Sequence, residues 1–304
     1  RANWPRILKR LRELAKEQGK QDLEDVEVRF TSAPGEAPAL TREAIAAGAK
    51  VVIAVGGDGS ISEVVQGFFD PESKQPLSQE CALGILPQGT GGDFKRMLPT
   101  ITDSLENNLK ALLSGEQHPV DVGSGILKGP EGEVRPRFFL NIASCGSSAF
   151  IAKLANEAPK FWGGTLTYLG ATVRGMATFS PPALRYRCDG GEWTQVEGVN
   201  CLAVCNGKYF GGGMKVAPEA EISDGAFDIT LISGCNVFDF VGLGHKLYSG
   251  EHVTATQFVK TFRCKTIEIE TVSGEQCIVE VDGETPWHVP ATFTLLQGAI
   301  KVIY

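Results

Sequence analysis

The sequence lacks any uninterrupted apolar run of the roughly 18 residues that a membrane-spanning helix requires. It opens on RANWPRILKRLRELAKEQGK, where apolar residues recur at helical spacing among charged ones. This pattern predicts an amphipathic helix and differs from the short apolar core of a signal peptide. We therefore expect a cytoplasmic protein that is at most peripheral to a membrane.

Paired cysteine motifs are lacking as well. The eight cysteines form no C-x-x-C pair and have no companion histidines at metal-binding spacing. Cys201, Cys205 and Cys277 lie in apolar, strand-like runs, where a buried free thiol is the usual state. This cysteine usage favours a reducing compartment.

The sequence has no excess of basic residues. Its net charge of -7 argues against broad nucleic-acid binding, because that partner usually requires a basic face. With 42% hydrophobic and 21% charged residues, the composition is that of a folded protein with a substantial core. Its 304 residues exceed the usual size of one domain, so we expect two domains and no nucleic-acid partner.

The first part of the chain alternates helical and strand-like patterns. Helices are expected near residues 7–16 and 37–47, and strands at VEVRF and VVIAV. Another helix follows from Ser60, then a strand at ALGIL and helices to about Leu113. This alternation predicts a three-layer α/β domain, in which helices cover both faces of a parallel sheet.

From about Val120 the pattern changes to strands with turn residues between them. Helices interrupt only near residues 147–156, 166–178 and 237–248. The pattern predicts a β-rich, sandwich-like second domain, so we divide the chain into residues 1–119 and 120–304, with the final strand free to return to the first domain. The expected strands are RFFLNIAS, ALRYRCDGG, VNCLAVCNG, AFDITLI, KTIEIE, CIVEVDGE, FTLL and IKVIY.

A glycine-rich loop follows the first buried strand, in VVIAVGGDGSISEVV. Gly56, Gly57 and Gly59 allow a phosphate to approach the backbone, and the next helix offers the N–H groups and positive dipole of its N-terminus. Asp58 would repel a phosphate alone, so we infer a bridging Mg²⁺. A tight turn with Asp58 as a helix cap is the alternative.

The residues after this aspartate also fit a helix start. Ser60 and Glu63 have the S-x-x-E spacing of a capping box, in which each side chain bonds a backbone N–H of the first turn. The structural interpretation is favoured for this pair, although Ser60 remains a candidate for nucleotide contact.

A second strand-to-loop unit, ALGILPQGTGGDFKRML, repeats the pattern. Gly89, Gly91 and Gly92 lie in its loop, and Thr90 and Asp93 supply polar side chains. Two such loops at the ends of parallel strands predict one shared cleft, and together they are more specific than either loop alone.

Neither loop matches the G-x-x-x-x-G-K-[ST] phosphate loop, and Ser62 stands where the dinucleotide fingerprint needs its last glycine. The loops instead resemble the diacylglycerol kinase catalytic family, especially bacterial soluble lipid kinases, with GGDGT-x-x-E-V and P-x-G-T-G-N-D-F-A-R. Here the stretches read GGDGSISEV and PQGTGGDFKR. Ser60 replaces the usual threonine, and Gly92 replaces an asparagine that accompanies the aspartate.

This resemblance implies an ATP- and Mg²⁺-dependent lipid kinase whose first domain is like those of NAD kinase and phosphofructokinase. Family members usually begin with a strand and an N-P-x-S-G loop that contacts the nucleotide. The chain opens on a helix instead, so we expect that a segment precedes it. Thr31, in RFTSAPGEA, matches a family position near the nucleotide, while a polar loop before a helix is the plainer interpretation.

The resemblance continues in NGKYFGGGMKVAPEAEISDGAFDITLI, so it covers nearly the whole chain. In bacterial relatives this stretch holds a structural Mg²⁺, which would place Asp224 as the side-chain ligand and Glu221 and Ala226 as carbonyl ligands. Oxygen donors around an Asp-Gly turn suit a hard cation. Without the resemblance, a metal-free hairpin turn would be the better interpretation.

A third stretch, VEVDGETPW, places Asp282 and Glu284 two residues apart, on one face if the strand continued through Gly283. Asp-Gly alone indicates a hairpin turn. The family carries its general base in this D-G-E motif, so the resemblance implies that Asp282 accepts the proton of the lipid hydroxyl. Glu284 would orient Asp282 or hold metal.

Two alternatives remain open at this point. NAD kinases and phosphofructokinases share a GGDG-type loop, although the late D-G-E motif favours the lipid group. The second alternative is a non-catalytic nucleotide- or lipid-binding relative. The replacement of the family asparagine by Gly92 favours it, and the retained aspartates argue against it. We expect a kinase of a lipid hydroxyl, such as that of diacylglycerol or a sphingoid base, with transient membrane contact; the lipid and the oligomeric state, including a homodimer, stay open.

Overall fold

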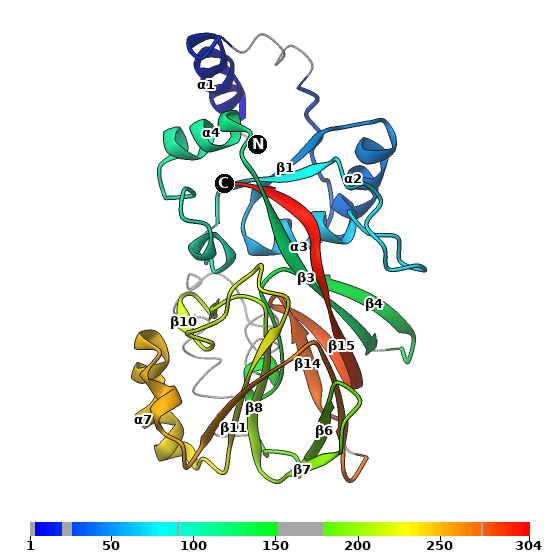
Figure 1. Ribbon diagram of the computed structural model, residues 1–304, viewed down its shortest axis with the longest axis vertical. Coiled ribbons are helices and arrows are strands. Elements are labelled where there is room, and N and C mark those ends of the chain that lie inside the picture. The colour runs from blue at the N-terminus through cyan, green and yellow to red at the C-terminus, as the bar shows by residue number, and fades with distance from the viewer. Residues whose placement is uncertain (1–3, 20–25, 90, 130, 151–178, 275) are drawn as a thin grey trace.

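The computed structural model describes residues 4–19, 26–89, 91–129, 131–150, 179–274 and 276–304. Figure 1 shows a half that is rich in helices, next to the chain ends, and a half built mainly of strands. Two long strands run from one half into the other and connect them.

The first half has three layers. Strands β1 and β2 pair in parallel, with Val51 opposite Ala82. Along β2, Leu83 and Ile85 pack with α3 in one hydrophobic cluster, whereas Ala82 and Leu86 pack with α1 and α4 in another. Alternate side chains of a strand point to opposite faces, so helices cover both sides of this sheet as predicted. The elements are α1 (Trp4–Glu17), α2 (Ala37–Ala46), β1 (Val51–Gly56), α3 (Asp58–Gln66), β2 (Ala82–Pro87), the 3₁₀ helix η1 (Phe94–Met97) and α4 (Leu105–Ser114).

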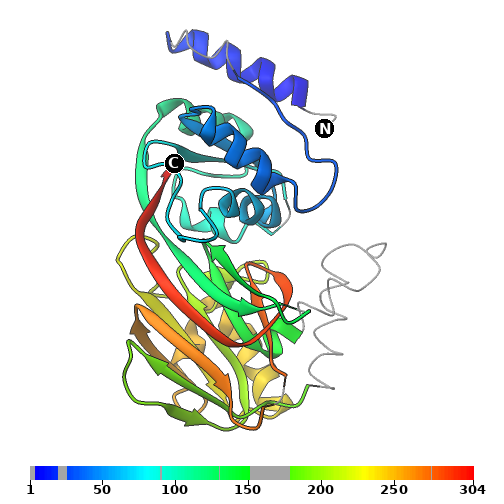
Figure 2. The ribbon, with the colours of Figure 1, turned by 90° about the vertical axis from the view of Figure 1, so that its right-hand side faces the viewer.

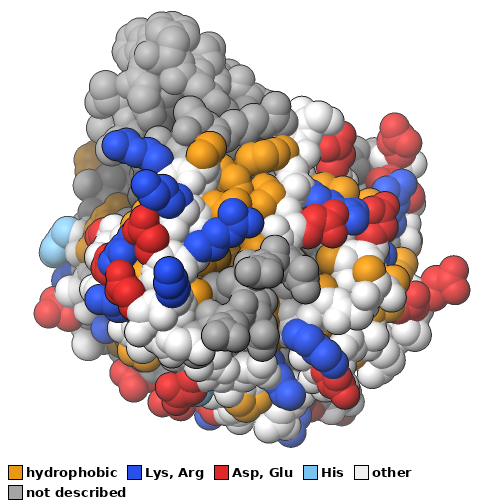
Figure 3. All heavy atoms as spheres, turned by 90° about the horizontal axis from the view of Figure 1, so that it is seen from above, with side chains coloured by type: hydrophobic (Ala, Val, Ile, Leu, Met, Phe, Trp, Pro, Cys, Tyr) orange, Lys and Arg blue, Asp and Glu red, His pale blue; other side chains and the backbone are white. Residues whose placement is uncertain are grey.

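Helix α1 is amphipathic, as the sequence predicts. Leu11 and Leu14 are buried against α4, and Arg10 donates two hydrogen bonds to Glu106 of that helix at 2.8 and 2.6 Å. Figure 3, which looks onto this end of the molecule, shows basic side chains close to acidic ones. On α1, Lys9 and Arg10 form ion pairs with Glu13, and Arg10 also pairs with Glu17 and Glu106.

The second half is one large curled sheet with a sandwich-like core. Its strands follow the order β12-β11-β8-β5-β14-β15-β13-β6-β7, and β3 and β4 branch from β15. Figure 2 shows the sheet curling over the buried interior. The elements are β3 (Gln117–Lys128), β4 (Val134–Phe139), β5 (Ile142–Gly146), β6 (Leu184–Cys188), β7 (Thr194–Val196), β8 (Val199–Cys205), β9 (Tyr209–Phe210), β10 (Met214–Lys215), β11 (Phe227–Ser233), α7 (Val237–Ser249), the 3₁₀ helix η3 (Glu251–Thr254), β12 (Val259–Cys264), β13 (Thr266–Thr271), β14 (Ile278–Val281) and β15 (Glu284–Ile303).

Strand β15 joins the two halves. The predicted strands FTLL and IKVIY are parts of this single 20-residue strand. Its far end pairs in parallel with β2, from Lys301 opposite Ala82 to Ile303 opposite Gly84, while β3 pairs with it in the antiparallel direction along its length. The final strand thus reaches the sheet of the first half.

The predicted strand VEVRF is wrong. Residues 26–30 form no strand, and Phe30 is 51% exposed. The charged side chains of this segment form ion pairs instead, because Arg29 contacts both Glu27 and Glu43. A strand requires a hydrogen-bonding neighbour, and among the described strands β1 pairs only with β2.

Other boundaries also differ from the prediction. RFFLNIAS divides into β4 and β5 with a break at Leu140 and Asn141, and the strands β3 and β12 were missed because polar residues interrupt their alternation. Of the predicted helix at 147–156, residues 147–150 are helical; its remainder and the helix at 166–178 lie outside the described residues. No helix within the described ranges is long and apolar enough to cross a membrane.

Candidate active site

The first glycine-rich loop connects β1 directly to α3. Gly57 is the N-cap residue of α3 in an extended conformation, and no side chain caps this helix end. The helix begins at Asp58, two residues earlier than the sequence indicates, so Ser60 lies inside its first turn. The predicted capping box is therefore wrong, and Glu63 instead accepts a hydrogen bond from the Gly35 amide at 3.0 Å.

The two glycine-rich loops are in direct backbone contact. A Cβ added at Gly89 would lie 2.5 Å from the Cα of Gly57, a separation that real Cβ atoms do not show. The Gln88 amide also donates to the Gly56 carbonyl at 2.8 Å. Glycine at this contact lets the loops form one surface, which confirms the prediction of a shared cleft.

Asp58 links the first loop to the second. Its Oδ2 accepts a hydrogen bond from the Gly92 amide at 2.7 Å, and its Oδ1 accepts one from the Phe94 amide at 3.4 Å. Gly92 has φ of +63°, a left-handed conformation that glycine and asparagine adopt most readily. Glycine in place of the family asparagine therefore keeps the backbone path of this loop.

Asp93 connects the second loop to the β-rich half. It is 9% exposed, and its Oδ2 accepts a hydrogen bond from the Gly212 amide at 2.8 Å, in the segment between β9 and β10. Arg96 bonds the Asp93 carboxylate at 3.1 Å and the Gly91 carbonyl at 2.6 Å. Burial raises the pKa of Asp93, and the Gly212 amide opposes this effect.

Asp282 is held at the tip of the β14–β15 hairpin. Asp282 and Gly283 have φ of +48° and +82°, and Val281 pairs with Glu284, as in a two-residue turn with positive φ at both positions. Backbone amides of Leu140, Asn141 and Ile142 donate to its carboxylate at 3.0, 3.1 and 3.0 Å. The break between β4 and β5 thus forms a cradle for this side chain.

The electrostatics of Asp282 are mixed. Burial raises its pKa to about 6, while the three amides oppose this by stabilising the ionised form. The negative charge of Asp58 raises the pKa further. The group is therefore a fixed carboxylate that can accept a proton near neutral pH.

These groups meet in a cavity of about 400 Å³ between the two halves. Asp58, Gly91 and Asp93 come from the first half, and Asp282 comes from the second. None of the described residues that line the cavity is a lysine or arginine, whereas four are carboxylic acids. This surplus of negative charge would be relieved by a cation.

The strand does not continue through Gly283, so the condition under which Glu284 would share a face with Asp282 is not met. The chain reverses at Asp282 and Gly283, and Glu284 begins β15, where its carboxylate pairs with Arg137 of β4. Burial raises the pKa of Glu284, and Arg137 opposes this effect. The catalytic role of Glu284 stays a prediction.

The expected structural metal site lies apart from the cavity. The Asp224 carboxylate accepts hydrogen bonds from Ala226 N, at 3.2 Å, and from the Arg263 guanidinium, and Glu221 is exposed. Because Arg263 already neutralises Asp224, these contacts do not favour a divalent cation there. Within the described residues, no three His, Cys, Asp or Glu side chains converge as a metal site.

Two threonines were also predicted to contact the nucleotide. Thr31 is exposed on the segment before α2 and does not line the cavity, and Thr90 lies outside the described residues. Nucleotide contact by Gly56, Gly57, Gly59, Ser60 and Gly89 stays a prediction. Gly56 ends β1, Gly57 and Gly89 are the glycines in contact, and Gly59 and Ser60 lie in the first turn of α3.

Sequence reasoning missed Glu280, which also lines the cavity and is 5% exposed. Its Oε1 accepts a hydrogen bond from Ser144 Oγ at 2.7 Å, and burial raises its pKa to about 7. The signal was a charged residue two positions before Asp282 within the apolar run CIVEV. Ser148, in the helical residues 147–150 after β5, was missed too.

Two family models cover most of the chain. Residues 2–125 match the diacylglycerol kinase catalytic domain, and residues 141–304 match the YegS C-terminal NAD kinase beta sandwich-like domain. The fold and the site therefore define a kinase of the NAD kinase-like architecture, which confirms the predicted fold class. The division at residue 119 stays a prediction.

Individual relatives agree with this class. The chain is 27% identical to a diacylglycerol kinase of Bacillus subtilis (strain 168) over 90% of this chain and 84% of that protein. It is 30% identical to a Pseudomonas fluorescens (strain Pf0-1) protein named "Probable lipid kinase YegS-like", over 90% and 82%. A solved diacylglycerol kinase from Bacillus anthracis str. Sterne has the same fold, with a TM-score of 0.65 at 23% identity, over 92% and 85%.

The chain belongs to the diacylglycerol kinase-type family of lipid kinases. The resemblance on which the sequence interpretation rested is thereby confirmed.

Proposed function

We propose that this lipid kinase transfers the γ-phosphate of ATP to the hydroxyl of a glycerolipid such as diacylglycerol, with Mg²⁺. The observation that carries the proposal is the single cavity in which the glycine-rich loops meet the Asp282 carboxylate. The name of the Bacillus subtilis relative supports diacylglycerol as the acceptor.

The first half would bind the nucleotide phosphates. The uncapped N-terminus of α3 and the contacting glycines at 57 and 89 leave backbone open to an anion. Bound Mg²⁺ would neutralise phosphate charge, and Asp58 is the residue we expect to hold it. The carboxylates of the cavity fit such a cation, which would share its coordination with the nucleotide.

Asp282 would act as the general base. The amides of residues 140–142 hold its carboxylate in place, which removes the need to order it during the reaction. The lipid hydroxyl would lose its proton to Asp282 as its oxygen forms a bond to the γ-phosphorus. The bond from that phosphorus to the bridging oxygen of ADP breaks, and ADP leaves with the electron pair.

Transfer of labelled γ-phosphate to a lipid panel in mixed micelles tests this function. We expect label in diacylglycerol with Mg²⁺ and ATP, and a loss of at least about 100-fold in Asp282→Asn. NAD and fructose 6-phosphate serve as soluble controls. Label only in a soluble acceptor, or ATP binding without any transfer, would contradict the proposal.

Peripheral membrane contact is part of the proposal, because the acceptor resides in a bilayer.

A further inference from the structure

Glu280 and Asp282 belong to one continuous surface along the β5–β14 strand pair. Glu280 lies opposite Ser144 in the antiparallel register, and the Asp282 amide donates to the Ile142 carbonyl at 2.9 Å. Ile278 precedes Glu280 by two residues, so the two side chains share a face of β14.

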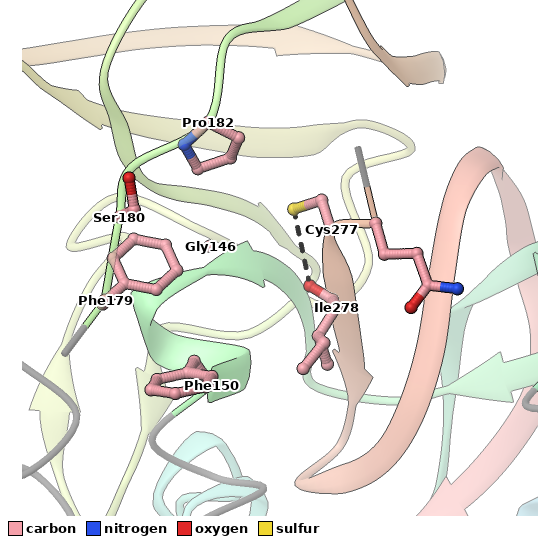
Figure 4. Close-up of a pocket in the computed structure, with 8 residues that line it drawn as sticks. Gly146, Phe150, Phe179, Ser180, Pro182, Cys277 and Ile278 are labelled. Atoms are coloured by element: carbon pink, nitrogen blue, oxygen red, sulfur yellow. Dashed lines mark hydrogen bonds between the residues drawn. The ribbon is translucent and has the colours of Figure 1, made fainter. Parts of the chain in front are cut away.

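A second cavity, of about 210 Å³, lies at the other end of this surface; its side chains are mostly apolar, with Ser180 and Gln276 also in its lining. In Figure 4 the rings of Phe150 and Phe179 lie on one side of it, and Ile278 and Cys277 lie on the other. The ring centroids of Phe150 and Phe179 are 5.7 Å apart. Travelling along β14 from the hairpin, a ligand would therefore meet Asp282 first, then Glu280, and then this apolar cavity.

Between the base and the apolar cavity lies a buried row of hydrogen-bonding groups. Ser144 Oγ donates to Glu280 Oε1 at 2.7 Å, and Ser144 and Ser148 hydroxyls are 2.7 Å apart. Glu280 and Ser148 line the active-site cavity. Ser144 uses its single proton for Glu280, so Ser148 is the donor in the Ser144–Ser148 contact, and its Oγ also lies 3.4 Å from Cys201 Sγ. A ligand carbonyl would take the Ser148 proton in exchange for the contact with Ser144.

We propose that Glu280, Ser144 and Ser148 bind the polar linkage of the acceptor lipid, next to the reacting hydroxyl, and thereby select an acceptor with an ester carbonyl there. The inference rests on the proposed function and names a determinant of its acceptor. The order of groups along β14 matches the order in a diacylglycerol: hydroxyl, ester, hydrocarbon.

The chemistry of the buried groups supports this assignment. Burial raises the pKa of Glu280 to about 7, so near neutral pH many molecules carry a proton there that can be donated to a carbonyl. The Gly283 amide also bonds this carboxyl, so Glu280 has a structural contact with the hairpin turn too. The experiment must therefore separate ligand selection from support of the turn.

A pair of matched acceptors provides that separation. 1,2-Dioleoylglycerol and 1,2-di-O-oleylglycerol have the same hydroxyl and chains, but only the first has ester carbonyls. We expect the wild-type protein to prefer the ester by roughly tenfold in kcat/KM, the value of one hydrogen bond. Ser148→Ala and Glu280→Ala should lose most of this preference while retaining activity on the ether.

Two further variants control the interpretation. Glu280→Gln keeps a donor and should retain part of the preference. Ser147→Ala changes the neighbouring buried serine and should retain the full preference. Its hydroxyl has no hydrogen-bond partner among the residues that the structure describes, and Ser147 is not among the residues that line the cavity. Thermal unfolding of each variant monitors folding.

Each remaining outcome contradicts the inference. An equal fall on ester and ether in Ser148→Ala and Glu280→Ala would assign these residues to support of the hairpin. An unchanged ester preference in both would remove them from acceptor binding. Transfer to neither lipid by the wild-type protein would overturn the proposed function itself, and this inference with it.

Discussion

At the scale of single residues, the environment of Asp282 determines what it can do. An exposed Asp-Gly pair would be only a hairpin turn, but here the β4–β5 break directs three amides at its carboxylate. Burial raises its pKa to about 6, which suits the role of base that we propose for it. The hairpin turn and the proposed base are thus one feature, rather than alternatives.

The raised pKa of Asp282 predicts a pH dependence of activity. A base must be ionised, and with a pKa of about 6 the ionised fraction falls as the pH drops below that value. We expect kcat/KM for diacylglycerol to decrease about tenfold per pH unit below pH 6, measured from pH 5 to 8. Glu280→Gln should leave this acid limb in place, and a profile that is flat down to pH 5 would contradict the assignment.

The sequence predicts the place of a residue where the signal lies next to it in the chain, such as the strand that it follows. Asp58 and Asp93 follow buried strands, so their convergence was predictable from the ends of a parallel sheet. The Arg137 partner of Glu284 was not, because 147 residues separate them in the sequence. Glu280 was missed because its apolar neighbours indicated an ordinary strand.

At the scale of elements, the glycine contact between the two loops is the most restrictive feature. A methyl group on Gly89 would collide with the backbone of Gly57 rather than with a flexible side chain. We predict that Gly89→Ala forces the loops apart, lowers stability by about 1–3 kcal/mol and weakens ATP binding. Thermal unfolding and calorimetric titration with Mg²⁺-ATP measure the two effects.

Gly242→Ala is the matched control for that variant. Gly242 lies within α7 and should gain rather than lose stability as a helical alanine. Among the described residues outside its own helical turn, no atom lies within 4 Å of an added Cβ. Wild-type ATP affinity in Gly89→Ala would mean that the close approach of the loops is not needed for nucleotide binding.

The Asp-Gly turn after β10 yields a prediction about metal removal. Arg263, on β12 opposite Asp228 of β11, contacts both Asp224 and Asp228 and supplies the positive charge at this turn. We expect chelation of divalent cations to leave the melting temperature unchanged. In Arg263→Ala the two carboxylates lose that partner, and added Mg²⁺ should then raise the melting temperature. A lower melting temperature of the wild-type protein after chelation would contradict this prediction. It would support the structural Mg²⁺ that the family resemblance implies.

Most element types were predictable, because hydrophobic periodicity and turn residues are local signals. Elements that depend on distant partners were not. VEVRF has strand-like alternation but no neighbouring strand among those described, whereas β3 forms despite polar residues because β15 and β4 pair with it.

At the scale of the whole molecule, β3 and β15 make the two halves one sheet system. Strand β15 begins at the hairpin that carries Asp282, and its far end pairs with β2 in the sheet of the first half. One continuous strand therefore links this hairpin to that sheet. The Asp93–Gly212 hydrogen bond adds a contact between the halves at the cavity itself. The sequence indicated a returning strand, but the 20-residue continuity of β15 could not be seen from its two separate apolar runs.

We propose that the cavity between the halves transfers phosphate from ATP to a lipid hydroxyl, with Asp282 as the base. The most direct test is a single-turnover assay with labelled ATP, Mg²⁺ and dioleoylglycerol, comparing the wild-type protein with Asp282→Asn at matched ATP occupancy. We predict rapid label transfer by the wild type and a decrease of at least about 100-fold in the variant, with ATP affinity retained. Equal transfer rates in the two proteins would contradict the account.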